Sequence, residues 1–309
     1  MQYFHKSVLL EEAVNGLDVK KDGLYVDATG GAGGHSKEIQ RRLGHKGRLV
    51  IIDRDPDAVE VLMNNFKKFE SVTVVRENFC DIHEVLDSLE IEKIDGVLMD
   101  LGVSSFQLDN TERGFCYKED AALDMRMEKD GVSARDVVNE YSLPELVKIF
   151  RDYGEERFAS QIAKNIERRR KKSLIKTTQE LVQIIESSIP AAARRRGGNP
   201  SKRVFQAIRI EVNKELDSLK LGLNACFERL NSGGRLCVIT FHSLEDSLVK
   251  KSFCRFVGGC ICPADFPICS CGREVLAEIV TKRAITPCEE ETRNNKRSRS
   301  AVLRIIKKI

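Results

Sequence analysis

Short apolar runs alternate with amphipathic stretches over the first hundred residues of the chain. Four of these runs have the length and composition of strands, at residues 24–28, 48–53, 72–76 and 94–100. Helix-like segments lie between them, such as 55–69 and 81–89. This alternation is typical of parallel strands joined by crossover helices, so it predicts an α/β fold.

Strand signals become rare after the fourth run. Helical periodicity dominates instead, in segments such as 133–150, 155–171 and 177–188. We therefore expect a helical insertion at residues 109–210 within a discontinuous core of residues 1–108 and 211–309. The insertion leaves the sheet at the carboxyl end of the fourth strand, the edge at which open α/β sheets bind ligands.

The last third of the chain returns to the core pattern. A long helical segment at about 201–231 precedes a β-prone run at 235–241, and a helix is expected from about residue 243. Two later β-prone pieces, 277–285 and 300–307, are expected to form an antiparallel pair at the sheet edge.

The strongest functional signal is the sequence LYVDATGGAGG at residues 24–34. Its apolar start is a strand that ends in Asp27, and four glycines follow within five positions, namely Gly30, Gly31, Gly33 and Gly34. Glycine lets the chain turn sharply off a buried strand and lets a ligand approach the backbone. The segment predicts a nucleotide-type binding site, although a plain turn between strand and helix has the same composition.

Two cofactors suit this turn, NAD and S-adenosylmethionine (SAM). The dinucleotide motif G-x-G-x-x-G fails when read from Gly31, because Ser36 stands at its last glycine. SAM needs a glycine turn, an acid near the first strand and a second acid for its ribose, which Asp27 and Asp53 supply. An acid at the end of the second strand also suits the ribose of NAD, so this pair favours SAM but keeps NAD as an alternative. Asp55-Pro56 is expected to begin the next helix as N-cap and first residue.

The composition narrows the class of protein. The chain has 309 residues, 41% of them hydrophobic, which is enough for one large core or two domains. Its longest apolar runs, about four to five residues, are far shorter than a membrane helix needs, and its first residues lack the apolar segment of a signal peptide. A cytoplasmic protein with reduced thiols is therefore expected. Six isolated cysteines are expected to be small buried hydrophobes: Cys80, Cys116, Cys226, Cys237, Cys254 and Cys288.

Positive charge is concentrated in one segment. The net charge is +4, but residues 151–210 hold 15 Lys or Arg and 6 Asp or Glu, so this segment carries +9 and the rest −5. Three clusters contribute most of it: Arg168, Arg169, Arg170, Lys171 and Lys172; Arg194, Arg195 and Arg196; Lys202 and Arg203. Such clustering is typical of a surface that binds a polyanion, whereas a single cluster can also be a solvated helix face.

Two residues at strand ends are candidate catalytic groups. Asp100 stands where amino-directed methyltransferases carry a hydrogen-bond acceptor for the target amino group, but Leu101 and Gly102 replace the prolines that usually follow it. It would orient such an amino group or only cap a turn. His242 ends a later strand and would contact substrate or only close the loop; Ser243 with Asp246 is expected to cap the helix after it.

Four further cysteines form two C-x-C pairs separated by six residues: Cys260, Cys262, Cys269 and Cys271. Four thiolates are enough for a tetrahedral zinc site. Structural zinc sites more often use C-x-x-C, so the sequence assigns no metal here. These cysteines are a weak zinc candidate, and the alternative is a loop of reduced thiols.

A series of motif blocks runs through nearly the whole chain. They include Asp27–Thr29 with Gly33–Ser36, Asp53–Pro56, Asp100–Asp109, Arg113–Phe115, Leu123–Met127, Tyr153–Phe158, Phe205–Ile210, Phe241–Asp246 and Arg297–Ser300. With these blocks in this order, the chain resembles the RsmH/MraW family of bacterial small-subunit (16S) rRNA cytosine-N4 methyltransferases.

The resemblance implies a class I, Rossmann-like SAM-dependent methyltransferase core with an inserted all-helical domain. It implies SAM as cofactor and N4 of a cytosine in the decoding region of 16S rRNA as methyl acceptor, presented by free rRNA or by the small ribosomal subunit. The SAM contacts that it implies are Gly33, Gly34, His35, Asp53, Phe79, Asp100 and Gln107. The basic clusters of the insertion are then expected to bind RNA. A monomer and a homodimer both remain open.

Two alternatives come from other classes of protein. An NAD-dependent oxidoreductase would bind its cofactor at the same sheet edge. A non-catalytic RNA-binding assembly factor would keep the cofactor pocket as a relic and use only the basic segment.

Overall fold

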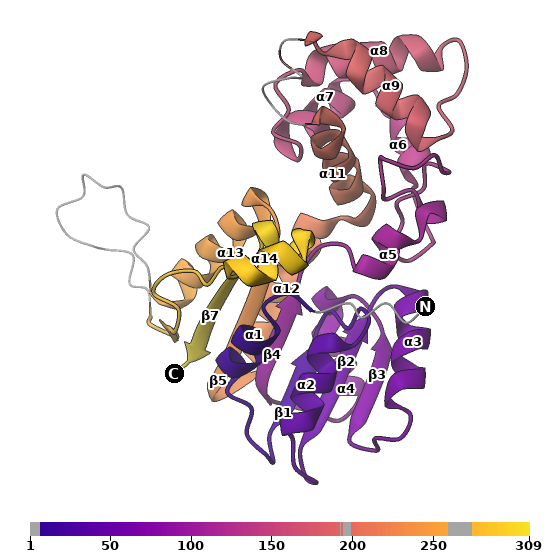
Figure 1. The fold of residues 1–309 in the computed structure, drawn as a ribbon. Helices are drawn as coiled ribbons and strands as arrows, with labels where there is room; N and C mark the ends of the chain where they lie inside the picture. Colours follow the sequence, from indigo (N-terminus) through magenta and orange to yellow (C-terminus); the bar gives the residue numbers. More distant parts are fainter. Residues whose placement is uncertain (1–6, 192, 194–198, 259–273) are drawn as a thin grey trace, which may run out of the picture. The chain divides into compact units, whose positions relative to one another are not determined.

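The computed structural model describes residues 7–191, 193, 199–258 and 274–309. The chain divides into two compact units, whose elements are labelled in Figure 1. Residues 1–102 and 216–309 form the first, which we call the sheet unit, and residues 103–215 form the second, which we call the helical unit.

One seven-stranded sheet organises the sheet unit. In spatial order its strands are β3 (Val72–Arg76), β2 (Arg48–Asp53), β1 (Leu24–Asp27), β4 (Ile94–Asp100), β5 (Leu230–Thr240), β7 (Val302–Lys308) and β6 (Ala277–Ile279). Neighbours among β1 to β5 are parallel, whereas β7 is antiparallel to both β5 and β6. This is the strand order of the class I methyltransferase fold, so the expected α/β class is confirmed. The predicted antiparallel pair at the edge is also confirmed, with β6 outermost.

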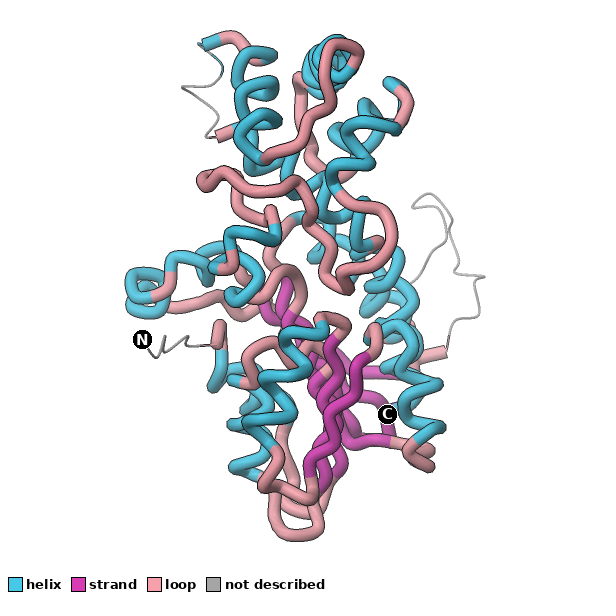
Figure 2. The backbone as a smooth tube through the Cα atoms, turned by 90° about the vertical axis from the view of Figure 1, so that its right-hand side faces the viewer, coloured by secondary structure: helices cyan, strands magenta, loops and turns pink. Residues whose placement is uncertain are grey.

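Helices cover both faces of this sheet (Figure 2). They are α1 (Leu10–Leu17), α2 (Gly34–Arg42), α3 (Pro56–Phe66), α4 (Ile82–Ser88), α12 (Glu215–Arg229), α13 (Ser243–Phe256) and α14 (Glu289–Asn294), with a 3-10 turn η1 at Phe79–Asp81 and another, η3, at Lys296–Ser300. Alternate residues of one strand enter different cores. Val50 and Ile52 of β2 pack with residues of α4, α12 and α13, whereas Leu49 and Ile51 pack with residues of α1, α2 and α3. Burial on both faces explains why these strands are continuous apolar runs.

The helical unit has its own apolar core, built from residues such as Phe150, Ile162, Leu181 and Ile208. Its helices are α5 (Ser105–Asp109), α6 (Ala134–Glu140), α7 (Leu143–Asp152), α8 (Ala159–Arg170), α9 (Thr178–Ser188) and α11 (Pro200–Asn213), with a 3-10 turn η2 at Thr111–Arg113. The unit is wider than the expected insertion at both ends. Val103 and Leu108 pack against its core, and Asn213 donates a hydrogen bond to the Met125 carbonyl.

Two predicted helical segments are each a pair of helices. Residues 133–150 are divided between α6 and α7, because Ser142 and Glu145 form a capping box that starts a new helix. Residues 201–231 are divided between α11 and α12, because Lys214 ends α11 in the left-handed conformation, at φ +49°. Among the described residues, no helix is both long and apolar enough to span a membrane.

Candidate functional site

The turn after β1 is held together by Asp27. Its buried carboxylate accepts a hydrogen bond of 2.5 Å from the Ser36 hydroxyl and one of 3.2 Å from the Thr29 N–H. Burial raises the pKa of Asp27 to about 6, although these hydrogen bonds favour the charged form. Asp27 therefore fixes the path of the chain from β1 into α2 and leaves a negative charge beneath the glycine turn.

Glycine is required at two positions of this turn. Gly33 has φ +82°, in the left-handed region, and stands at the N-cap of α2 without a side chain to cap the helix. At Gly30, a Cβ atom would come within 2.6 Å of side-chain atoms of Ile51 and Leu62. The turn therefore lies close against β2 and α3 and presents bare backbone where a ligand is expected.

Asp53 at the end of β2 joins this turn from a distant part of the sequence. Its Oδ2 accepts a hydrogen bond of 2.7 Å from the Gly31 N–H, and its Oδ1 accepts one of 2.8 Å from the Asp55 N–H. Burial raises the pKa of Asp53 to about 6. Asp55 caps α3 as predicted, through a 3.0 Å hydrogen bond from the Asp57 N–H, with Pro56 following it. Each oxygen of Asp53 keeps a second lone pair for a ligand hydroxyl.

Asp100 at the end of β4 contains an unpartnered acceptor. Its backbone N–H donates a 2.6 Å hydrogen bond to the Thr29 hydroxyl, and its Oδ2 lies 3.6 Å from His35 Nδ1. Its Oδ1 is buried and has no hydrogen-bond partner among the described residues. Such an atom is costly in a folded protein, which points to a donor supplied from outside the chain. Burial raises the pKa of Asp100 well above its usual value, and the charges of Asp27 and Glu245 add to the shift.

His35 is oriented by a contact to the start of the chain. Its buried ring lies with Nε2 3.1 Å from the Val8 carbonyl, the arrangement of a donor Nε2–H. In the neutral ring this leaves Nδ1, the atom that faces Asp100, without a proton. Thr29 and His35 thus fix the backbone and the surroundings of Asp100. The sequence did not indicate this role of Thr29.

Phe79 lies at the start of η1 and is half-buried. Its ring packs against α12 at Gly222, where a Cβ atom would approach the ring to 2.5 Å. The lack of a side chain at Gly222 therefore makes room for the ring. Only the family resemblance indicated Phe79 as a candidate cofactor contact.

His242 caps the helix after β5, which corrects the prediction that Ser243 and Asp246 do so. The His242 Nδ1 accepts a 3.4 Å hydrogen bond from the Glu245 N–H, and Glu245 accepts one of 2.8 Å from the Phe241 N–H. Asp246 instead pairs with Arg304 at 2.6 Å and with Lys250 at 2.7 Å. His242 thus closes the loop, and its buried partner Glu245 adds negative charge near Asp100.

Gln107 belongs to the helical unit. Its side chain is buried and accepts a 3.0 Å hydrogen bond from the Ser104 N–H, while Ser104 caps the Gln107 N–H in return. This capping box explains the start of α5. It fixes Gln107 within its own unit, whatever further contact it makes.

The basic candidates differ in how much of their charge is used inside the helical unit. Arg170 donates to the Val138 carbonyl, Arg169 lies 3.6 Å from Glu180, and Lys171 lies 3.4 Å from Glu167. Arg203 pairs at 2.7 Å with Glu156, whose side chain is fully buried. Arg168, Lys172 and Lys202 are exposed and have no such partner among the described residues. Arg194, Arg195 and Arg196 lie outside the described residues.

The cysteine predictions are partly wrong. Of the six isolated cysteines only Cys226 and Cys237 are buried, and burial raises the pKa of Cys226 to about 12. Cys80 and Cys116 are half-buried, and Cys254 and Cys288 are exposed. Cys288 sits at a helix start, where its sulfur accepts a hydrogen bond from the Glu291 N–H, a role that does not require burial. The zinc candidates Cys260, Cys262, Cys269 and Cys271 lie outside the described residues.

The chain is similar over its whole length to one family of known proteins. The family model described as the MraW methylase family matches residues 2–309. The protein named ribosomal RNA small subunit methyltransferase H of Lachnospira eligens is 51% identical over 311 residues, covering 100% of this chain and 99% of that protein. The protein of the same name from Caldicellulosiruptor saccharolyticus is 52% identical over 308 residues, covering 99% of this chain and 100% of that protein. These matches confirm the resemblance indicated by the motif blocks.

Proposed function

This chain belongs to the MraW methylase family, and we propose that it transfers a methyl group from SAM to the N4 amino group of a cytosine in small-subunit (16S) rRNA. The substrate comes from the names of its relatives, which are small-subunit rRNA methyltransferases. Membership of this family excludes the alternative of an NAD-dependent oxidoreductase, because a methylase transfers a methyl group rather than a hydride.

The observation that carries the proposal is the unpartnered Oδ1 of Asp100. The exocyclic amino group of cytosine carries two N–H donors, and one of them would satisfy this buried acceptor. The lone pair of that nitrogen is delocalised into the ring, so a hydrogen bond that orients the amino group favours its reaction. We assign Asp100 this orienting role. Because burial raises its pKa, its carboxylate is also a stronger base for the proton released after transfer.

The residues of the sheet unit suit SAM as the methyl donor. SAM supplies a methyl group already activated by a sulfonium centre. The glycine turn leaves room for a ligand beside bare backbone, and the free lone pairs of Asp53 suit the ribose hydroxyls. Asp27 and Asp53, whose pKa values are about 6, give this edge of the sheet a negative potential at neutral pH, which favours a ligand of net positive charge. By family resemblance, Phe79 lies at the adenine, and Gly33, Gly34 and His35 complete the cofactor contacts of this unit.

The protein's part in the reaction is alignment rather than activation. Placing the nitrogen about 3–3.5 Å from the methyl carbon accounts for much of the rate in such transfers. The cytosine must leave its stack to reach a pocket, which is easiest in single-stranded or irregular RNA. We assign phosphate binding to exposed cations of the helical unit, with Arg168 and Lys202 as its accessible members.

Product analysis tests the proposal. The purified chain is incubated with SAM and either a 16S rRNA transcript or small subunits from a strain lacking the gene, and the nucleosides are analysed by mass spectrometry. We expect N4-methylcytidine with the wild type and a loss in kcat of about 100-fold or more with Asp100→Ala. Glu60→Ala, an exposed acid on α3, is the matched control. Unchanged N4-methylcytidine in the deletion strain would favour the binding-only assembly factor.

A further inference from the structure

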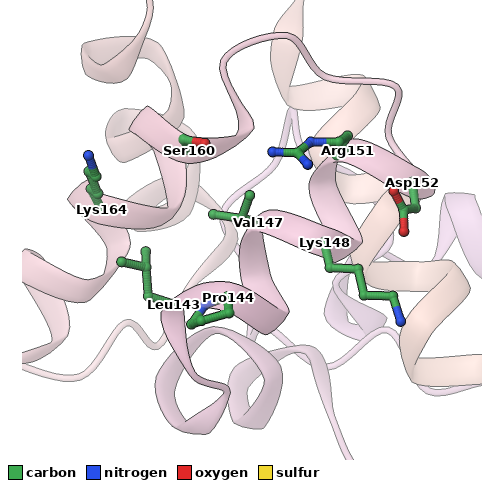
Figure 3. Close-up of a pocket in the computed structure, with 8 residues that line it drawn as sticks. All are labelled: Leu143, Pro144, Val147, Lys148, Arg151, Asp152, Ser160 and Lys164. Carbon is green, nitrogen blue, oxygen red and sulfur yellow. The ribbon is translucent and has the colours of Figure 1, made fainter.

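A surface pocket of about 450 Å³ lies between α7 and α8 of the helical unit. Figure 3 shows the eight residues that line it: Leu143, Pro144, Val147, Lys148, Arg151, Asp152, Ser160 and Lys164. All of them belong to the helical unit, and none is among the residues that the sequence analysis singled out. The pocket therefore shares no residue with the candidates for cofactor binding and catalysis.

The floor of the pocket is an apolar stripe on α7. Leu143 and Val147 are four residues apart, so they lie on one face of the helix, next to Pro144. The neighbouring face of α7 carries Leu146 and Phe150, which are fully buried in the core of the unit. Leu143 and Val147 are only partly buried against that core, and Pro144 is exposed. The stripe is thus apolar surface that the unit itself leaves uncovered.

Cations surround this floor. Lys148 and Arg151 come from α7 and Lys164 from α8, and Figure 3 shows the Arg151 guanidinium extending toward Ser160. All three are exposed, and within the described part of the chain none of them has a hydrogen-bond or ion-pair partner. Lys171 and Arg203 of the same unit, by contrast, pair with acids. With Asp152 as the one acid of the lining, the pocket has a formal charge of +2.

We propose that this pocket binds a nucleotide of the RNA strand other than the target cytosine. The nucleobase lies on Leu143, Pro144 and Val147, and the flanking phosphates are held by Lys148, Arg151 and Lys164. The Ser160 hydroxyl offers a hydrogen bond to a phosphate or a 2′-hydroxyl. The volume is in the usual range for a small-molecule site. The inference rests on the proposed function, since it is the rRNA substrate that supplies this nucleotide.

An apolar floor with unpaired cations at its rim matches the two faces of a nucleotide, a flat base and an anionic backbone. An acidic segment of a ribosomal protein would satisfy the cations but would leave the apolar stripe uncovered. The charge of the surrounding segment, +9 over residues 151–210, also favours a long polyanion over a short acidic peptide.

Salt-dependent binding tests the proposal. The triple variant Lys148→Ala, Arg151→Ala, Lys164→Ala is compared with a control of equal charge change on the sheet unit, Lys46→Ala, Lys67→Ala, Lys68→Ala, all exposed. The probe is an unmodified, protein-free 16S rRNA transcript in filter binding from 0.05 to 0.5 M salt. The loss of three phosphate contacts makes the negative slope of log K against log salt shallower by about 2, and it weakens binding at 0.15 M salt by about 50-fold. The control is expected to keep the wild-type slope.

Two results of binding measurements would overturn the pocket assignment, and a third would come from crosslinking. One is a triple variant that binds the transcript like the control. The other is a triple variant weakened only toward assembled small subunits, which would indicate a ribosomal protein as the occupant. Photocrosslinking of a 4-thiouridine transcript is expected to label peptides of residues 143–152 or 159–170, and label confined to other peptides contradicts the proposal. If the wild type methylates rRNA but the pocket experiments contradict the assignment, the proposed function still holds. A wild type that binds neither SAM nor RNA would refute both the proposed function and the pocket assignment.

Discussion

Replacing Asp53 by Asn separates the structural role of this residue from its cofactor role. Asp53 accepts one hydrogen bond with each oxygen, from Gly31 at 2.7 Å and from Asp55 at 2.8 Å. Asn has the same shape but one acceptor oxygen, so its amide N–H₂ faces one of these two donors. An unpaired donor there costs about 1–3 kcal/mol. Against this, the rise in the Asp53 pKa to about 6 corresponds to roughly 3 kcal/mol that disfavours its ionised form, and Asn removes that cost.

The two effects nearly offset at pH 7, where we expect Asp53→Asn to change the free energy of unfolding by no more than about 2 kcal/mol. They do not offset at every pH. The folded-state pKa of Asp53 lies above the unfolded value, so the folded wild type binds more protons between about pH 4 and 6 and loses stability as the pH rises through that window. The variant lacks this titration. The stability of the wild type relative to Asp53→Asn should therefore fall by about 2 kcal/mol from pH 4 to 6 and become level above about pH 7.

Urea titrations at pH 4, 5, 6 and 7 measure this difference, with Glu60→Gln on the exposed side of α3 as the control. Parallel pH profiles for the wild type and Asp53→Asn would refute the burial argument. Calorimetry at pH 7.5 measures the cofactor role separately, and we expect the Kd for SAM to rise at least tenfold, or about 1.4 kcal/mol. An unchanged Kd would refute the ribose assignment whatever the stability data show.

Three further predictions concern the same two units. Thr29→Val removes the hydroxyl that accepts from the Asp100 N–H, so it should cost about 1–3 kcal/mol of stability and lower kcat at least tenfold. Thr29→Ser keeps the hydroxyl and should retain the wild-type stability and kcat. A fully active Val variant would contradict the positioning role of Thr29. Arg203→Ala removes the ion-pair partner of the buried Glu156, which keeps the hydrogen bond from the Phe158 N–H. Because the Arg203 side chain is itself 38% exposed, the loss should destabilise the protein by about 1–3 kcal/mol in a thermal melt. Arg168→Ala should leave the melt unchanged and weaken only RNA binding. The affinity for SAM should rise as the pH increases through about 6, because ionisation of Asp27 and Asp53 favours a cationic ligand. Calorimetry at pH 5 and pH 8 measures the Kd, and equal values would exclude this dependence of SAM binding on the two acids.

Local sequence patterns predicted the framework of this protein. Apolar runs located all five parallel strands, because a strand buried on both faces has few polar positions to break it. The acids at the ends of β1, β2 and β4 were recognised as site candidates because each follows an apolar run at a position where SAM or a target amino group needs an acid. Family motifs then supplied what periodicity lacks, the cofactor class and the substrate.

Partners that lie far apart along the chain could not be predicted in this way. The bond from Gly31 to Asp53 spans 22 residues and that from Asp100 to Thr29 spans 71, and no local pattern encodes either. Charge runs likewise marked Arg203 as a candidate for RNA, whereas packing commits it to Glu156. The unpaired cations around the α7–α8 pocket are spread over two helices, so they form no run in the sequence. Sequence periodicity records which residues are buried, but the tertiary structure alone decides which buried or charged group each of them meets.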